Sequence, residues 1–122
     1  MIKFKRLAKS FKYALSGLKK VWLEEQNFQV HSIITVIVLV LAWYFQIAIW
    51  QLIILILLIA LVLILEIINS IMERFIDLLK PRIHEYVKDI KDMGAALVFV
   101  GAITAVIVGL MIFLPYFIAL LS

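Results

Sequence analysis

The stretch Leu61-Val-Leu-Ile-Leu-Glu66-Ile-Ile-Asn69-Ser70-Ile-Met-Glu73-Arg-Phe-Ile-Asp77 decides the fold. A run of aliphatic residues there acquires an amide and a series of carboxylates. At 100° per residue, Glu66, Glu73 and Asp77 lie within about 40° of one another on a helix, and Asn69 lies about 60° to one side. Charged groups inside an apolar helix are costly and commonly mark a functional site. The stretch therefore predicts a membrane helix that carries a polar site near its end.

The composition is that of an integral membrane protein. Of the 122 residues, 66% are hydrophobic, compared with about 45–50% apolar residues in a typical soluble domain. No linker, low-complexity tract or repeat divides the chain, so residues 1–122 are interpreted as one domain. The absence of cysteine excludes disulfide and thiol chemistry.

Residues 3–24 predict an amphipathic helix that lies on the membrane surface. Apolar residues recur at steps of three or four, and lysines fill much of the opposite face. We interpret the basic face as a contact with lipid phosphates, and no nucleic-acid partner is expected. A plain basic flank of the first span is the alternative. The apolar positions are Phe4, Leu7, Phe11, Ala14, Leu18 and Trp22.

Apolar segments predict transmembrane helices at residues 30–49, 52–68 and 95–121. The first has about the 20 residues that cross a hydrocarbon core of roughly 30 Å. The second is expected to continue as a helix to about Leu79, where Pro81 then blocks it. A polar, partly helical connection is expected at residues 82–92. Small residues in the third span, such as Gly94, Gly101 and Gly109, favour close helix packing.

Charge predicts the orientation of the chain. All 12 Lys and Arg residues lie in residues 1–20 or 74–91. The positive-inside rule therefore places both segments in the cytoplasm and the C-terminal end outside. The 8 acidic residues fall on the same side. Any chemistry is thus expected at the cytoplasmic interface, where a soluble nucleotide and a lipid headgroup can both reach it.

The polar face permits phosphoryl transfer. Carboxylates from two segments can hold Mg²⁺, a cation that prefers oxygen ligands and nucleotide phosphates. Lys91 can offer its charge to a phosphate. Glu66 lies deepest, between Leu65 and Ile67, and is a candidate general base. The chain has no P-loop and no kinase glycine-rich loop. It would therefore perform phosphoryl transfer without the nucleotide-binding motifs that soluble enzymes use.

Other interpretations remain open from the residues alone. The face can be a polar packing cluster, or the proton pathway of a small transporter with Glu66 as the carrier. A pathway would need polar groups across the bilayer, whereas the acids gather at one end. A non-catalytic adaptor that recruits anionic lipid is a third possibility, and it leaves the polar face without a purpose.

These residues together resemble a known family. Glu66-x-x-Asn69-Ser70-x-x-Glu73-x-x-x-Asp77, followed by His84-Glu85 and Lys91-Asp92-Met93-Gly94-Ala95-Ala96, is similar to the signature of the bacterial diacylglycerol kinase family. The resemblance extends upstream to Tyr13, Gly17, Trp22, Glu25 and Phe28. It implies an all-α integral membrane protein of the bacterial inner membrane, with a surface helix and three transmembrane helices. It also implies a homotrimer whose subunits share active sites.

The resemblance further implies roles for individual residues. Glu66 resembles the general base that deprotonates the lipid hydroxyl, and Asn69 resembles an amide that orients the base or the substrate. Glu25 and Glu73 resemble the pair that holds Mg²⁺ on the phosphates of ATP, the co-substrate. Asp77 matches an acidic position with either a structural or a direct role. The other positions that match nucleotide contacts are Arg6, Tyr13, Arg82, Ile83, His84, Lys91 and Asp92.

The resemblance implies undecaprenol or diacylglycerol as the lipid acceptor. The stretch Asn27-Phe28-Gln29-Val30-His31 is similar to the Gram-positive branch, which is associated with undecaprenol kinase activity, and so is Phe113-Leu114-Pro115. The run Lys91-Asp92-Met93-Gly94 instead resembles the Gram-negative branch, which prefers diacylglycerol. The sequence favours undecaprenol and keeps diacylglycerol as the alternative.

Overall fold

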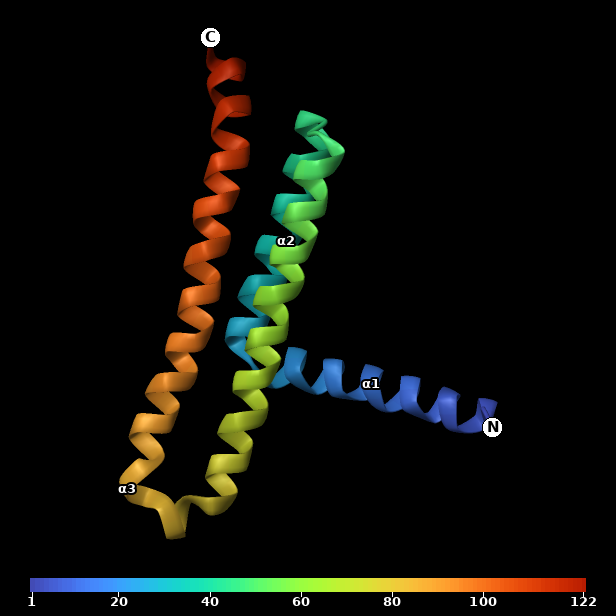
Figure 1. Ribbon diagram of the computed structural model, residues 1–122, viewed down its shortest axis with the longest axis vertical. Coiled ribbons are helices and arrows are strands. Elements are labelled where there is room, and N and C mark those ends of the chain that lie inside the picture. Colours follow the sequence, from blue (N-terminus) through green and yellow to red (C-terminus); the bar gives the residue numbers. More distant parts are fainter.

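The computed structural model describes residues 1–82 and 84–122 and contains helices α1 (Phe4–Glu24), α2 (Gln26–Phe45) and α3 (Ile49–Leu121). Helix α3 folds back on itself, so that its two arms run alongside α2 as a bundle (Figure 1). We call Ile49–Arg82 the first arm and His84–Leu121 the second arm. Helix α1 projects sideways from the bundle (Figure 1).

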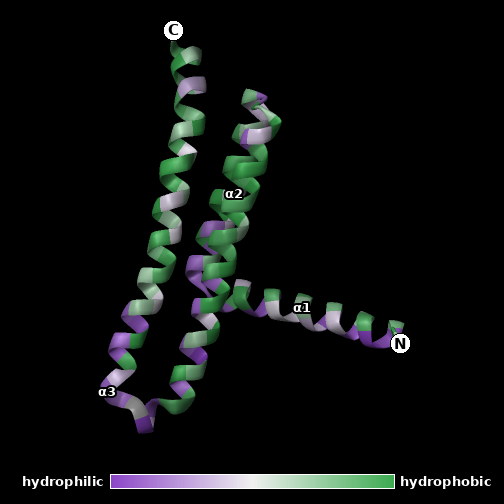
Figure 2. Cartoon of the chain, in the orientation of Figure 1, coloured by the Kyte–Doolittle hydropathy of each residue, from purple (hydrophilic) through white to green (hydrophobic). Residues whose placement is uncertain are grey.

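The bundle has the dimensions of a multi-pass membrane protein. Helix α2 and both arms of α3 are each long and apolar enough to cross a membrane, with 20, 34 and 38 residues. The arms exceed the roughly 20 residues that a bilayer requires, so their ends extend beyond its apolar core. Polar residues gather at the end where α3 reverses and along one face of α1 (Figure 2). The expected all-α membrane architecture is confirmed.

The joint between α1 and α2 is shorter than the sequence indicates. Only Glu25 leaves the helical conformation, with φ −113° and ψ 108°, and α2 begins at Gln26 rather than at Val30. The polar residues from Gln26 onward belong to α2, because their backbone N–H and C=O groups take part in its helical hydrogen bonds. The side chain of Gln29 also reaches back across the joint and donates to the carbonyl of Trp22 at 2.6 Å.

The other end of α2 is also displaced from the expected position. The helix ends at Phe45, because Gln46 adopts the left-handed conformation with φ 51° that commonly closes a helix. The turn to α3 is therefore confined to the residues before Ile49.

Helical backbone continues through Pro81, contrary to the expectation that this residue would end the helix. Proline fixes φ near the helical value but removes one backbone hydrogen bond, so it bends a helix as readily as it ends one. The direction of the chain reverses in this region (Figure 1). The connection at residues 82–92, expected to be partly helical, belongs to α3.

An aromatic cluster fastens the end of the bundle opposite the reversal. The ring of Phe45 lies 4.9 Å from that of Phe117 and 5.7 Å from that of Tyr116, measured between centroids. The hydroxyl of Tyr116 donates to Oε1 of Gln51 at 2.6 Å. The same oxygen accepts the backbone N–H of Ala48 at 3.1 Å, so one side chain joins the turn, the first arm and the second arm.

Small residues let the two arms approach closely. A Cβ atom added at Gly101 would collide with the side chain of Leu65, and one added at Gly94 would collide with that of Asn69. Gly109 has open space around it. Part of the small-residue face is therefore used within the chain, as expected for close packing of membrane helices.

Candidate functional site

Glu66 is the centre of the site and is only 4% exposed. The imidazole of His31, on α2, approaches it with 3.2 Å between Nε2 and Oε1. Oε1 has no other ion-pair partner and accepts no regular hydrogen bond among the residues that the structure describes. A buried carboxylate with unused hydrogen-bonding capacity is unfavourable for folding alone, and it can accept a hydrogen bond from a substrate.

Glu25 lies beside this centre at the joint between α1 and α2. Its Oε1 accepts a hydrogen bond of 2.8 Å from the hydroxyl of Ser70, which is 3% exposed. The preceding carboxylate, Glu24, pairs with Arg74 one helical turn further along α3. The joint is thus fastened to the first arm by two successive side chains. The sequence carries only a weak signal for these two contacts. Ser70 and Arg74 are four residues apart, so they lie on the same face of a helix.

Asn69 faces the second arm. Its Oδ1 is buried without a hydrogen-bond partner among the described residues, and it lies against Gly94. Glu73 is half-buried one turn further along, and its charge acts on Glu66, as does that of Glu25. The structure therefore brings Glu25, Glu66, Asn69 and Glu73 together, and we call these four residues the polar cluster.

Lys91 and Asp92 point to different partners. Lys91 crosses from the second arm to the first, where its Nζ lies 3.1 Å from Oδ1 of Asp77. Asp92 pairs instead with Lys88 on its own helix, with 3.0 Å between the charged atoms. Lys91 therefore belongs to the end of the polar face, whereas Asp92 lies on an exposed surface of the second arm.

The remaining candidate residues lie away from the polar cluster. Arg82 and His84 are exposed at the reversal, and Ile83 lies outside the described residues. Arg6 and Tyr13 are exposed on α1, which projects from the bundle (Figure 1). Tyr13 is about 18 Å from Glu25 along the helix axis, at 1.5 Å per residue. Within one chain, the structure does not bring these residues to Glu66.

The polar cluster fits Mg²⁺ by the chemistry of its donors. Across residues 1–82 and 84–122 there is no group of three or more His, Asp or Glu side chains that could hold a metal. Mg²⁺ needs fewer, because it binds one or two carboxylates and completes its shell with phosphate oxygens and water. Glu25 and Glu73 supply such carboxylates, and Asn69, one helical turn before Glu73, has an unpartnered Oδ1.

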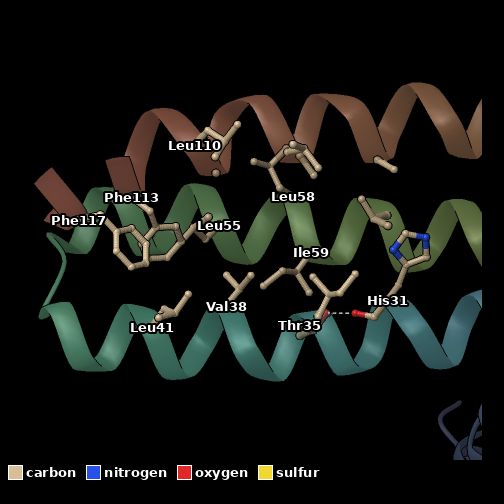
Figure 3. A pocket seen from close by; sticks show the side chains of 16 residues that line it. His31, Thr35, Val38, Leu41, Leu55, Leu58, Ile59, Leu110, Phe113 and Phe117 are labelled. Atoms are coloured by element: carbon tan, nitrogen blue, oxygen red, sulfur yellow. Dashed lines mark hydrogen bonds between the residues drawn. The ribbon is translucent and has the colours of Figure 1, made fainter. Parts of the chain in front are cut away.

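An apolar groove leads from the site into the bundle. It has a volume of about 360 Å³ and runs between α2 and both arms of α3, from His31 to Phe117 (Figure 3). His31 and Thr35 are the polar side chains that line it, and both lie near one end (Figure 3). The groove thus has the shape and polarity to receive an apolar chain with a polar head beside His31. Sequence reasoning missed it, because it depends on how three helices pack.

Known proteins match this chain over most of its length. A sequence model of the family described as prokaryotic diacylglycerol kinase matches residues 12–113. Undecaprenol kinase of Bacillus subtilis (strain 168) is 36% identical over 110 residues, which cover 90% of this chain and 89% of the relative. Diacylglycerol kinase of Escherichia coli (strain K12) is 33% identical over 104 residues, 85% of each chain. Diacylglycerol kinase of Helicobacter pylori (strain ATCC 700392 / 26695) is 36% identical over 100 residues, 82% of this chain and 78% of the relative.

Proposed function

The chain belongs to the prokaryotic diacylglycerol kinase family, and we propose that it is a membrane lipid kinase that transfers the γ-phosphate of ATP to the hydroxyl of a lipid alcohol. We propose undecaprenol as the main acceptor and diacylglycerol as the alternative. Relatives with these two names are almost equally similar, at 36% and 33% identity, so overall similarity does not choose between them. The stretch from Asn27 to His31 favours undecaprenol.

One observation carries the proposal: the carboxylate of Glu66 is buried against His31, which lines the polar end of an apolar groove, and further acidic side chains act on it. A lipid alcohol has the matching shape, an apolar chain that ends in a hydroxyl group. A proton pathway is less well supported, because the groove beyond Thr35 is lined by apolar side chains. A plain packing cluster would leave fewer buried oxygens without donors.

In the proposed reaction, Glu66 accepts the proton of the lipid hydroxyl. The lipid oxygen then forms a bond to the γ-phosphorus while the bond to the departing ADP oxygen breaks. Asn69 orients the base or the lipid hydroxyl, for which its unpartnered Oδ1 is suited. Phosphoryl transfer depends mainly on positioning and charge neutralisation, so a rigid helical frame is an appropriate support.

The acidic pair of the cluster supports a role in holding the nucleotide. Glu25 and Glu73 would bind Mg²⁺, with Ser70 fixing the orientation of the Glu25 carboxylate. When bound, Mg²⁺ neutralises charge on the phosphates of ATP. Lys91 would offer a further positive charge to a phosphate. The other proposed nucleotide contacts are Arg6, Tyr13, Arg82, Ile83, His84 and Asp92.

We propose further that the enzyme is a homotrimer whose subunits share active sites, with the polar cluster on the cytoplasmic side of the bacterial inner membrane. The position of α1 supports sharing, because this helix, which carries the exposed Arg6 and Tyr13, projects sideways from the bundle of its own chain (Figure 1). A neighbouring chain can cover the groove and meet these residues. The charge distribution supports the orientation.

Transfer of radiolabelled phosphate from ATP to undecaprenol and to diacylglycerol, in one detergent preparation, tests the function. We expect label in the lipid fraction, with undecaprenol the better acceptor by kcat/KM. Glu66→Gln should lower transfer by at least about 100-fold, since general-base catalysis contributes roughly 10²–10⁴-fold, while ATP binding persists. Asp89→Asn makes the same change on an exposed surface and serves as the matched control. Normal transfer by Glu66→Gln would refute the assignment of the base.

A further inference from the structure

We propose that His31 is a positioning residue for Glu66, holding one carboxylate oxygen so that the other faces the lipid hydroxyl. This inference rests on the proposed lipid kinase function. His31 comes from α2, whereas the polar face from Glu66 to Asp77 lies on α3. The catalytic carboxylate is thus oriented by a separate helix.

The geometry singles out this pair. Nε2 of His31 lies 3.2 Å from Oε1 of Glu66, and among the described side chains His31 is the only ion-pair partner of Glu66. The other charged groups that act on Glu66, Glu25 and Glu73, are themselves acids and repel it. Where Nε2 carries a proton, no other cation among the described residues competes with it for Oε1.

His31 also stands between the groove and the base. It lines the groove, and its ring is directed from α2 toward the first arm of α3 (Figure 3). Glu66 does not line the groove. A hydroxyl group that arrives along the groove would meet the imidazole at the point where it touches Oε1. A small displacement of His31 would therefore misalign the base and the acceptor, and a misplacement of about 1 Å can cost roughly 100-fold in rate.

A purely structural role for His31 is unnecessary, because other contacts already fasten this part of the bundle. The hydrogen bond from Ser70 to Glu25 joins the start of α2 to the first arm. The aromatic cluster around Phe45 joins the other end of α2 to the second arm. The position of His31 itself is fixed by its helix, in which the hydroxyl of Thr35 donates to the carbonyl of His31 at 2.8 Å.

The test compares His31→Leu with His31→Gln. Leucine removes the N–H, whereas the amide nitrogen of glutamine can occupy the place of Nε2. We expect His31→Leu to lower kcat about 10- to 100-fold with the KM for ATP within about twofold of the wild-type value. His31→Gln should restore most of that loss. Ser32→Ala is the matched control, since the hydroxyl of Ser32 bonds only to the carbonyl of Phe28 in its own helix.

Several results would overturn the inference: a wild-type kcat for His31→Leu, no advantage of glutamine over leucine, or a change confined to the KM for lipid. If His31→Leu does not fold, His31→Asn replaces it as the variant that lacks the contact. The shorter amide of asparagine ends near the place of Nδ1 and does not reach that of Nε2. The inference then requires a higher kcat for His31→Gln than for His31→Asn. A wild-type chain that phosphorylates no lipid alcohol would overturn the proposed function as well. If the wild-type protein is active and the His31 variants have the same kcat, only the role of His31 would be overturned.

Discussion

Ser70 donates a hydrogen bond of 2.8 Å to Glu25, so the polar face of the first arm holds the residue at which the chain turns from α1 into α2. Glu25 is also one of the two proposed ligands of Mg²⁺. The same carboxylate therefore takes part in the architecture of the joint and in the proposed nucleotide site.

Ser70→Ala should weaken the proposed metal site more than the fold. The change removes the donor that orients the Glu25 carboxylate, and loss of such a supporting contact typically costs about 10- to 100-fold in metal affinity. We expect the Mg²⁺ concentration for half-maximal activity to rise about tenfold, measured by titration at saturating ATP. Ser32→Ala removes a half-buried hydroxyl that bonds only within α2, and it should leave this value unchanged. An unaltered Mg²⁺ requirement in Ser70→Ala would show that the bond from Ser70 does not orient a metal ligand.

Gly94→Ala should impair catalysis through Asn69. The added Cβ would collide with Oδ1 of Asn69, and relief of the collision must rotate the amide or separate the arms. We expect kcat to fall about tenfold or more, because displacements of about 1 Å at a reacting centre have effects of this size. Gly17→Ala is the control, since the space around Gly17 on α1 is open. Full activity of Gly94→Ala would mean that the arms can separate without cost to the site.

Tyr116→Phe should lower stability and leave the chemistry intact. The change removes the hydroxyl that donates to Gln51 at 2.6 Å, at the end of the bundle opposite the polar cluster. Loss of such a bond typically costs about 0.5–1.5 kcal/mol. We expect a lower melting temperature in detergent, with kcat unchanged well below it. The exposed Tyr44, changed to Phe, is the matched control, and equal melting temperatures of the two variants would show that the bond to Gln51 contributes nothing.

The helical period predicts the polar face well, because residues seven and eleven positions apart share one side of any regular helix. The apolar runs likewise predict the membrane helices, since a bilayer requires continuous apolar surface. Such local regularities do not depend on how the helices later pack. The identity of Glu66 and Asn69 as neighbours on one face therefore followed from spacing alone.

Contacts between helices could not be predicted in this way. The approach of His31 to Glu66 depends on the rotation of α2 about its axis, and the bond from Ser70 to Glu25 depends on the angle at a single non-helical residue. The continuation of helix past Pro81 depends on whether the lost hydrogen bond can be tolerated where the chain reverses. Such features are decided by packing, about which a linear pattern carries little information.

The burial of Glu66 bears on what happens to ATP when no lipid is bound. Its carboxylate is closed to bulk solvent, and the nearest cavity is an apolar groove that gives a water molecule little to bind. Water is the acceptor that a kinase must reject, because transfer of the γ-phosphate to water would consume ATP without making the lipid phosphate. We therefore expect hydrolysis of ATP in lipid-free detergent to be far slower than transfer to a lipid alcohol. Selectivity against water would then come from the low polarity of the approach to the base.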